Sequence, residues 1–284
     1  MTSAELPSFD LVVATVDRTA ELDRLLSSLD RQTHRGFRVL VVDQNDDDRI
    51  ADVVAAHDLD VLRLRSPRGL SRARNVALPH LAANVVAFPD DDCAYADEDL
   101  LERVGRRFLD HPDLDGLTGR AVGVAGSSSP SWETDNAILT DDNLWNRAIS
   151  FTIFLRRGLL TEAGQFDEQL GLGSGTPWSS GEEIDLLIRA VRSGARISYD
   201  PQLTVRHEDA TLEADELRAL GYRDGASVGY LLRKHRYPAR VRSRMLIRPL
   251  GGAVASLGRG DGARARFHLA TLRGRVDGLR GRVK

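Results

Sequence analysis

The chain has 284 residues and carries 39 Lys and Arg against 42 Asp and Glu, which gives a net charge of −3. Its composition, 42% apolar and 29% charged, is that of an ordinary globular protein and excludes a disordered or low-complexity chain. The single cysteine excludes an intrachain disulfide and a multi-cysteine zinc site, and it fits a reducing compartment.

The N-terminal and C-terminal segments of the chain indicate the cellular location that we expect for it. The N-terminal residues lack the basic and then apolar layout of a signal peptide, and no apolar run approaches bilayer-spanning length. We therefore expect a cytoplasmic protein whose membrane contact is peripheral. From residue 211 to residue 284 there are 17 basic and 6 acidic residues, so this segment carries +11 and the remainder −14. This asymmetry predicts a C-terminal extension with its own anionic partner.

The first part of the chain alternates between short apolar runs and amphipathic segments. The runs rich in β-branched residues predict strands at 9–15, 38–43, 60–64 and 85–88. The segments with apolar residues at helical spacing predict helices at 19–32, 50–54, 71–77 and 100–109. This alternation is typical of right-handed βαβ units on a mainly parallel sheet flanked by helices, an α/β fold.

The second part has a looser pattern. Further strands are predicted at 115–125, 148–155, 196–199 and 203–205, and further helices at 158–163 and 182–193. Between them, residues 126–146 are expected to form a long loop. Beyond Thr211 an apolar and basic mixture with repeated glycines predicts short amphipathic helices, broken at Pro238 and Pro249.

Three adjacent carboxylates, Asp90, Asp91 and Asp92, follow the predicted strand 85–88. Like charges at the carboxyl end of a strand repel each other, so they need a cation or a solvated face. Ligands of open α/β sheets bind at this edge, and hard divalent ions prefer oxygen ligands. The turn is therefore a candidate metal site, and the alternative is a solvated acidic turn without a ligand.

A second distinctive segment, 68–75, places three arginines around Gly69 at a predicted helix start. Free backbone N–H groups and guanidinium groups both suit phosphate, so this segment is a candidate diphosphate site. The alternative is a capped helix with a solvated basic face. Its position one strand before the aspartates favours a diphosphate bound together with a metal.

Glu182 and Glu183 begin a predicted helix after a loop rich in glycine and serine. A carboxylate in this position suits a general base that faces a bound substrate, but the helix dipole alone also favours acidic residues there. His207, at the end of a predicted strand, is a candidate metal ligand or a structural histidine.

Taken in order, these segments resemble family 2 glycosyltransferases of the GT-A fold. The resemblance is carried by residues 12–15 with Arg18, 41–43, 69–75, 88–93, 164–168 with 170–171, 181–186 with Arg189, and 201–207. It implies an inverting enzyme that uses a UDP-, dTDP- or GDP-linked sugar donor together with Mn²⁺ or Mg²⁺.

The resemblance also implies roles for individual residues. The nucleotide-binding set would be Thr15, Arg18, Asp43, Arg68, Arg74, Asp90 and Asp91. The metal would be ligated by Asp90, Asp92 and His207, and the acceptor would be contacted by Trp145, Trp178 and Asp185. Where the family usually has Glu-Asp this chain has Glu182-Glu183, so Glu183 stands at the position of the catalytic base with one extra methylene. The choice between the two glutamates stays open.

The implied activity moves a sugar to a saccharide or lipid-linked acceptor, in the assembly of cell-surface polysaccharide or glycolipid. Residues 1–210 would form the catalytic domain, with a nucleotide-binding half at 1–110 and an acceptor-binding half at 111–210. The extension 211–284 would contact the anionic inner face of the cell membrane, or pack on the core or on a second subunit of a homodimer. No nucleic-acid partner is expected.

Two other functions remain open at this point. One is a catalytically silent module that binds a nucleotide-sugar. The other is a metal-dependent nucleotidyltransferase, for which the chain lacks the N-terminal phosphate loop rich in glycine and lysine.

Overall fold

A computed structural model describes residues 5–123, 132–208 and 212–282. The chain divides into two compact units. Unit 1 consists of residues 1–68, 72–166 and 186–209, and unit 2 of residues 69–71, 167–185 and 210–284. The beginning of the loop predicted at 126–146 and the domain boundary predicted at 210 lie outside the described residues, and the predicted domain division stays a prediction.

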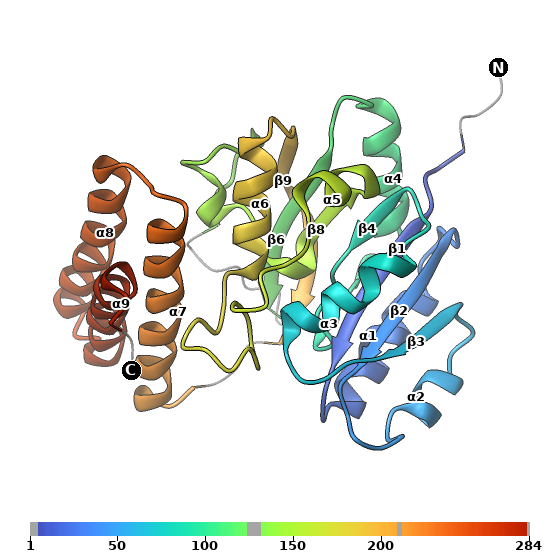
Figure 1. Ribbon diagram of the computed structural model, residues 1–284, viewed down its shortest axis with the longest axis horizontal. Helices are drawn as coiled ribbons and strands as arrows, with labels where there is room; N and C mark the ends of the chain where they lie inside the picture. The colour runs from blue at the N-terminus through green and yellow to red at the C-terminus, as the bar shows by residue number, and fades with distance from the viewer. Residues whose placement is uncertain (1–4, 124–131, 209–211, 283–284) are drawn as a thin grey trace. The chain divides into compact units, whose positions relative to one another are not determined.

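Unit 1 contains a mixed sheet (Figure 1). Its strands are β1 (Phe9–Thr15), β2 (Phe37–Asp43), β3 (Val61–Arg65), β4 (Val85–Ala87), β5 (Cys93–Ala94), β6 (Gly116–Gly123), β7 (Ala137–Ile138), β8 (Ile153–Arg156) and β9 (Ile197–His207). They follow the order β3-β2-β1-β4-β8-β6-β9-β5, with β7 also paired to β9. Strands β1 to β4 are parallel to one another and β9 is parallel to β6, whereas β8 is antiparallel to both of its neighbours. The predicted mixed, mainly parallel sheet is confirmed.

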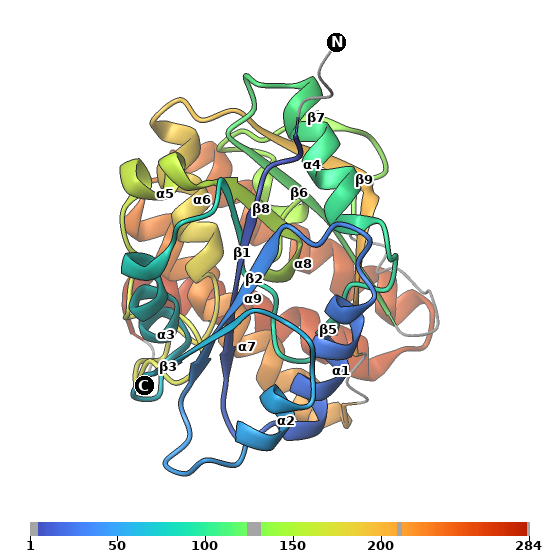
Figure 2. The same ribbon diagram turned by 90° about the vertical axis from the view of Figure 1, so that its right-hand side faces the viewer.

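Helices cover both faces of the sheet. They are α1 (Thr19–Asp30), α2 (Ala51–Ala55), α3 (Leu70–Ala77), α4 (Leu100–Asp110), α5 (Arg157–Ala163) and α6 (Glu182–Arg192), with short 3₁₀ turns η1 (Leu78–His80), η2 (Leu144–Asn146) and η3 (Ser150–Thr152). Figure 2 shows α1 and α4 on one side of the sheet and α3 and α5 on the other. Coverage of both faces explains why β1 and β2 carry apolar residues at consecutive positions, 11–14 and 39–42, instead of alternating with polar ones.

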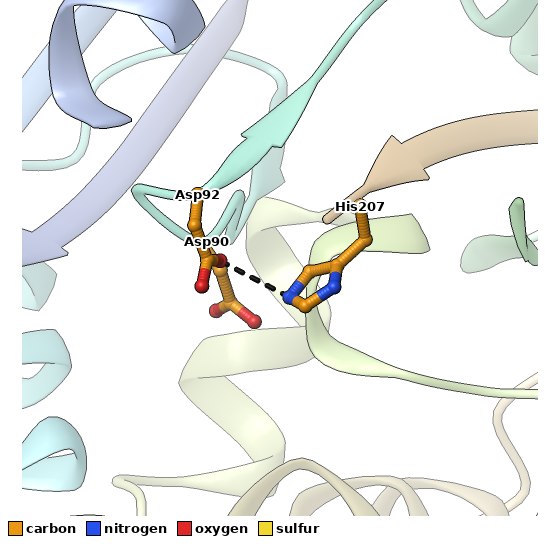
Figure 3. A group of neighbouring side chains, drawn as sticks. All are labelled: Asp90, Asp92 and His207. Atoms are coloured by element: carbon orange, nitrogen blue, oxygen red, sulfur yellow. Dashed lines mark ion pairs between the residues drawn. The ribbon is translucent and has the colours of Figure 1, made fainter. Parts of the chain in front are cut away.

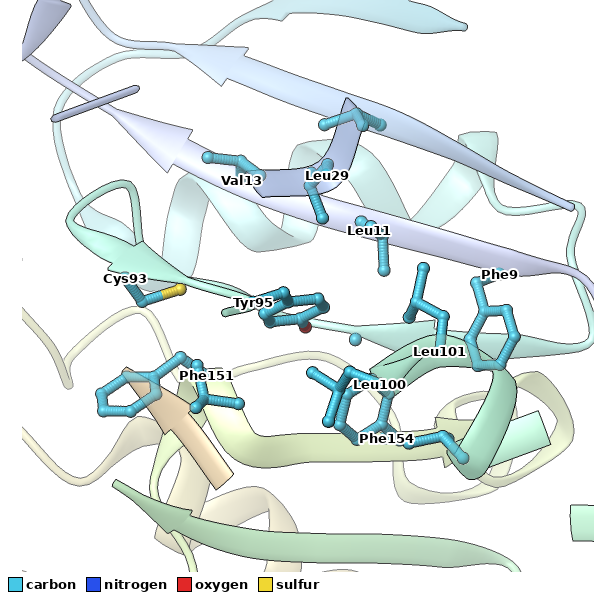
Figure 4. Packing of buried hydrophobic residues seen from close by; sticks show 14 of the residues in the cluster. Phe9, Leu11, Val13, Leu29, Cys93, Tyr95, Leu100, Leu101, Phe151 and Phe154 are labelled. Carbon is cyan, nitrogen blue, oxygen red and sulfur yellow. The ribbon is translucent and has the colours of Figure 1, made fainter. Parts of the chain in front are cut away.

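The core of unit 1 lies between the sheet and the pair α1 and α4. Phe9, Leu11 and Val13 of β1 pack here with Leu29 of α1 and Leu100 of α4, and all five side chains are fully buried (Figure 4). The residues between them in β1 point to the other face and are also buried. This packing holds the central strands rigidly, so the residues that follow their carboxyl ends have a fixed scaffold.

The two strands predicted at 196–199 and 203–205 form one long strand, β9. Its pairing with β6 shifts in register between Thr118 and Arg120. At this shift Gly119 lies so close to β9 that an added Cβ would be 2.0 Å from the backbone oxygen of Leu203. Because Gly119 has no side chain, the irregular middle of β9 can lie against β6 at this point. The pairing of β6 with β9 then continues from Arg120 opposite Thr204 to Gly123 opposite His207.

The C-terminal extension forms three long helices, α7 (Ala214–Lys234), α8 (Ala239–Gly258) and α9 (Gly262–Arg280). The predicted break at Pro238 is confirmed, because this residue caps the start of α8. The predicted break at Pro249 is wrong, since Pro249 lies buried inside α8. Proline lacks the N–H that would bond to the carbonyl of Met245 four residues earlier, and the guanidinium of Arg275 in α9 donates to that oxygen instead.

Glycines bring α7 and α9 into close contact along their length. A Cβ at Gly225 of α7 would lie 2.3 Å from the backbone oxygen of Thr271, and one at Gly274 of α9 would lie 2.2 Å from that of Tyr222. Backbone atoms of the two helices thus touch where side chains would normally separate them. Among the described helices, none is long and apolar enough to cross a membrane.

Candidate active site

The carboxyl ends of three parallel strands meet at one edge of the sheet in unit 1. Thr15 ends β1 and pairs in register with Asp43, which ends β2. Strand β4 runs parallel to β1 and is followed by the turn with Asp90, Asp91 and Asp92. The prediction that these side chains share one edge is therefore met by the strand directions.

His207 joins this edge through the pairing of β5 with β9. Residue Cys93 of β5 lies opposite His207 in the antiparallel ladder, so the imidazole comes next to the turn that precedes β5. Its ring stacks on that of Phe151, with centroids 4.9 Å apart and planes 14° apart. Sheet pairing and ring stacking together hold the imidazole in one orientation.

Asp90, Asp92 and His207 form a compact group of metal-binding side chains (Figure 3). Each offers one ligand atom, and these atoms all lie within 4.8 Å of one another. His207 Nε2 is 3.1 Å from Asp92 Oδ1. Two carboxylates and an imidazole suit Mn²⁺ or Mg²⁺ and leave coordination positions for phosphate oxygens, so the residues present fit the predicted ion.

His207 and Asp92 form an ion pair. The hydrogen bond to Asp92 raises the pKa of His207, against the effect of burial. Burial alone would raise the pKa of Asp92, but its contacts with His207 and Arg18 lower it. A bound divalent ion would replace the imidazolium proton as the partner of this carboxylate.

Two arginines balance the other carboxylates of the turn. Arg18 Nη1 lies 2.9 Å from Asp91 Oδ1 and 2.5 Å from Asp92 Oδ2. Arg74, which is 1% exposed, donates to Asp90 Oδ1 at 3.0 Å. Burial raises the pKa of Asp91 in spite of its contacts with Thr15 and Arg18. The turn is thus a charged cluster that is already partly neutralised by protein cations.

Asp43 is completely buried and is held as an anion. Its Oδ1 accepts hydrogen bonds from the backbone N–H and the side-chain amide of Asn45, at 2.9 and 2.7 Å. Its Oδ2 accepts two from Arg63, at 3.0 and 2.6 Å. Burial would raise the pKa of Asp43, but these donors outweigh it and lower the pKa. Arg68 is exposed and pairs with Asp17 at 2.7 Å.

Some residues at this edge carried no prediction. Ser150 donates to Asp90 Oδ2 at 3.0 Å, and Asn45 and Arg63 surround Asp43. Arg63 and Arg65 stand two residues apart at the end of a predicted strand, so both side chains lie on the same face. This pattern could have predicted a cationic partner for a carboxylate on the neighbouring strand. Ser150 has no recognisable sequence signal, since it reaches Asp90 only through the order of strands.

The predicted catalytic glutamates begin α6 in unit 2. Gly181, with φ of 89°, turns the chain into the helix. Glu182 is 4% exposed, and its Oε2 would lie 3.2 Å from a Cβ added at Gly171. Glu183 is half-buried. Of the two carboxylates, Glu183 is the more accessible to a substrate.

Asp185 anchors this helix start to α7. The carboxylate is completely buried and lies 2.5 Å from Lys234 Nζ and 2.7 Å from His235 Nε2. Lys234 also pairs with Asp167 at 2.6 Å. Asp185 therefore holds the first turn of α6 in place, and its predicted contact with an acceptor stays a prediction.

The two tryptophans predicted to contact the acceptor lie in different units. Trp145 lies half-buried in η2 of unit 1. Trp178, in unit 2, stacks on Tyr230 of α7 with ring centroids 4.6 Å apart and planes 18° apart. The structure thus adds Tyr230 as an aromatic neighbour of Trp178 that the sequence did not indicate.

Comparison with known proteins gives matches over most of the chain. The chain is 28% identical over 288 residues to the pre-mycofactocin glycosyltransferase of Mycobacterium tuberculosis, covering 93% of this chain and 56% of that protein. It therefore spans about half the length of the curated relatives it matches.

Two solved structures share its fold. S. aureus TarS 1-349 in complex with UDP-GlcNAc has a TM-score of 0.62 at 18% identity, covering 96% of this chain and 92% of that one. The mannosyltransferase PcManGT from Pyrobaculum calidifontis, in complex with GDP-Man and Mn²⁺, has a TM-score of 0.68 at 15% identity, covering 98% and 89%. These likenesses confirm the predicted GT-A-like fold.

The family model described as Glycosyl transferase family 2 matches residues 10–164, which is more than half of the 284 residues. The matched range includes β1 to β4, Arg18, Arg74 and the Asp90–Asp92 turn, whereas His207, the third member of the metal-binding group, lies beyond it. The resemblance read from the sequence is thereby confirmed, and the chain belongs to glycosyl transferase family 2.

Proposed function

We propose that the chain is a metal-dependent, inverting glycosyltransferase that takes its sugar from a nucleotide-diphosphate donor. The observation that carries the proposal is the group of Asp90, Asp92 and His207 at the carboxyl edge of the sheet, with Arg18 and Arg74 beside it. A diphosphate brings negative charge that a divalent ion and two arginines would balance. The ion would be held by the two carboxylates and the imidazole, and it would supply charge neutralisation for the departing nucleoside diphosphate.

The remaining donor contacts are assigned to residues of unit 1. Thr15 and Asp43 would orient the nucleoside, and Arg18, Arg68 and Arg74 would pair with the diphosphate as it leaves. Arg18 is already within hydrogen-bond distance of two carboxylates, so it can exchange one of them for a phosphate oxygen when the donor binds. Asp91 would keep Arg18 aligned during this exchange.

Glu183 is the proposed general base. It would accept the proton of the acceptor hydroxyl as the hydroxyl oxygen attacks the anomeric carbon, while the bond to the diphosphate oxygen breaks. One in-line attack inverts the anomeric centre, so no covalent intermediate with the protein is required. The accessibility of Glu183 supports it over Glu182, which is 4% exposed.

The acceptor is proposed to be a saccharide or a lipid-linked molecule of cell-surface polysaccharide or glycolipid assembly. Trp145 and Trp178, one in each unit, are each proposed to stack on a sugar of the acceptor. The name of the M. tuberculosis relative points to pre-mycofactocin as another acceptor class to include in a screen. A homodimer, also expected from the sequence, is tested by light scattering of the purified chain.

The first test is a thermal-shift screen with UDP, GDP and dTDP, each with Mn²⁺ and with EDTA. We expect one nucleotide to raise the melting temperature only when Mn²⁺ is present, because a ligand that binds the native state stabilises it by mass action. If no nucleotide raises the melting temperature under either condition, the proposed site does not bind a nucleotide donor and the proposal fails.

The second test separates an enzyme from a silent nucleotide-sugar-binding module. Glu183→Gln should abolish sugar transfer while metal-dependent nucleotide binding persists. Glu182→Gln is the matched control, and a larger loss with this variant would reverse the assignment of the base. If the wild-type protein binds the nucleotide-sugar donor but neither transfers nor hydrolyses its sugar, the result supports a catalytically silent binding module. Release of pyrophosphate from a nucleoside triphosphate and a sugar phosphate would instead reveal a nucleotidyltransferase.

A further inference from the structure

The exposed side of α8 carries a row of large apolar residues. Ile247, Leu250, Val254 and Leu257 are 63%, 44%, 70% and 62% exposed. Their spacing of three, four and three residues places them on one face of the helix. The opposite face holds Val241, Met245, Pro249 and Ala253, which are buried. The apolar row is therefore additional to the face that packs within unit 2.

A basic row adjoins the apolar one. Arg240, Arg244 and Arg248 follow at intervals of four residues, and all three are exposed. With Arg242 they give α8 a charge of +4, and the helix contains no Asp or Glu. Arg275 on α9 also lies near this row: burial lowers its pKa to about 10, and the positive charge of Arg248 contributes to the shift.

We propose that this surface, defined by the apolar row 247–257 and the basic row of Arg240, Arg244 and Arg248, docks on an anionic lipid bilayer. A helix with an apolar stripe beside a basic one lies in the plane of a membrane interface, with its apolar side chains among the acyl chains and its arginines at the phosphates. The inference concerns where the chain is held and goes beyond the proposed sugar transfer, on which it does not depend.

Charge complementarity selects the lipid surface over a second copy of this chain. Two copies joined through α8 would bring together two helices that each carry a charge of +4, whereas acidic phospholipids present a surface of opposite charge. A contiguous apolar row on a charged helix is also the feature that marks membrane or partner surfaces in other proteins.

The experiment is co-sedimentation of the full chain with vesicles of phosphatidylcholine alone and of phosphatidylcholine mixed with phosphatidylglycerol. The wild type should sediment with the mixed vesicles only, and less so as salt is raised. Arg240→Gln/Arg244→Gln should weaken binding about thirtyfold, because each basic residue near an anionic surface contributes about fivefold. Val254→Gln/Leu257→Gln should weaken it by about tenfold or more, since the apolar contribution is lost.

Matched controls carry the same changes on helices of unit 1 or at their ends. Arg31→Gln/Arg106→Gln removes two exposed arginines, and Leu109→Gln removes an exposed leucine of α4, which is 38% exposed. Both should bind like the wild type, and unchanged circular dichroism should show that every variant is folded.

The proposal is overturned by absence of binding to the mixed vesicles, by equal binding to neutral vesicles, or by an equal loss of binding in the control variants. A dimer that Val254→Gln/Leu257→Gln converts to a monomer would assign the row to a second copy instead. Each readout is independent of transfer, so an inactive chain that still binds the mixed vesicles separates this proposal from the proposed function.

Discussion

Arg275 of α9 donates a hydrogen bond to the backbone oxygen of Met245 in α8, the carbonyl that Pro249 leaves without its helical N–H. A side chain from a neighbouring helix thus replaces a missing backbone donor. This contact gives a physical reason why α8 continues past a proline in its eleventh position.

Replacing Arg275 by methionine should lower the free energy of unfolding by about 1 to 3 kcal/mol, because a buried carbonyl loses its donor. The same substitution should cost less in a Pro249→Ala background, where the backbone N–H is restored. Urea unfolding of the four variants gives this coupling as a double-mutant cycle. Arg273→Met is the control, since its side chain is 80% exposed. An equal cost of Arg275→Met in both backgrounds would contradict the explanation.

The contact between α7 and α9 predicts opposite effects for two Gly→Ala substitutions. Gly225→Ala should destabilise the protein by about 1 to 3 kcal/mol, because the new Cβ would meet backbone that cannot move aside. Gly251→Ala, in α8, meets nothing within 4 Å and should stabilise it by up to about 1 kcal/mol through helix propensity. Chemical denaturation measures both. Similar changes in the free energy of unfolding at the two positions would show that helix propensity, and not the close contact of α7 with α9, determines the effect.

Lys234→Met should destabilise the start of α6, because Asp185 and Asp167 would lose their shared cation inside unit 2. We expect a loss of up to about 3 kcal/mol, with His235 retaining part of the pairing. Asp185→Asn added to Lys234→Met should recover stability, since the unpaired charge is removed. Arg218→Met on the exposed side of α7 is the matched control. Thermal unfolding of these variants distinguishes an ion pair from simple loss of side-chain volume, which Asp185→Asn would not repair.

Stability should depend on pH through His57, which lies between Asp30 Oδ2 at 2.6 Å and Asp23 Oδ1 at 2.9 Å. Burial lowers the pKa of His57, but the two carboxylates outweigh it and raise the pKa above the ordinary 6.5. The stabilisation is therefore fully present below pH 6.5 and is lost as pH rises through the folded-state pKa. Urea unfolding across this range should show the decline in the wild type and a smaller one in His57→Gln. Equal slopes would assign the pH dependence to other groups.

Asp92→Asn should weaken Mn²⁺ binding and remove the metal-dependent nucleotide shift. Loss of outer-shell partners alone costs roughly 10- to 100-fold in metal affinity, so loss of a ligand should cost at least about as much. Titration calorimetry with Mn²⁺ and nucleotide measures the change, and Asp52→Asn on the exposed surface of α2 serves as control. Unchanged Mn²⁺ affinity in Asp92→Asn would remove this residue from the metal site.

The local elements were predictable because each is encoded within a few residues. Short runs rich in β-branched residues marked β1 to β4, and the rule that parallel strands share a carboxyl edge placed Thr15, Asp43 and Asp90 together. The candidate base positions were also local, because Glu182 and Glu183 directly follow the glycine that starts α6.

What depended on long-range pairing was decided by the tertiary structure alone. His207 reaches the aspartates because β9 pairs with β5, and no local pattern specifies that strand order. The length of β9 depends on Gly119 in another strand, and the continuity of α8 depends on Arg275 in another helix. In each case a group distant in sequence supplies the hydrogen bond or the space. Local patterns therefore predicted most elements of unit 1 and the chemistry at their ends, because these depend on neighbouring residues, whereas contacts between distant residues decided the continuity of β9 and α8 and the approach of His207 to the aspartates.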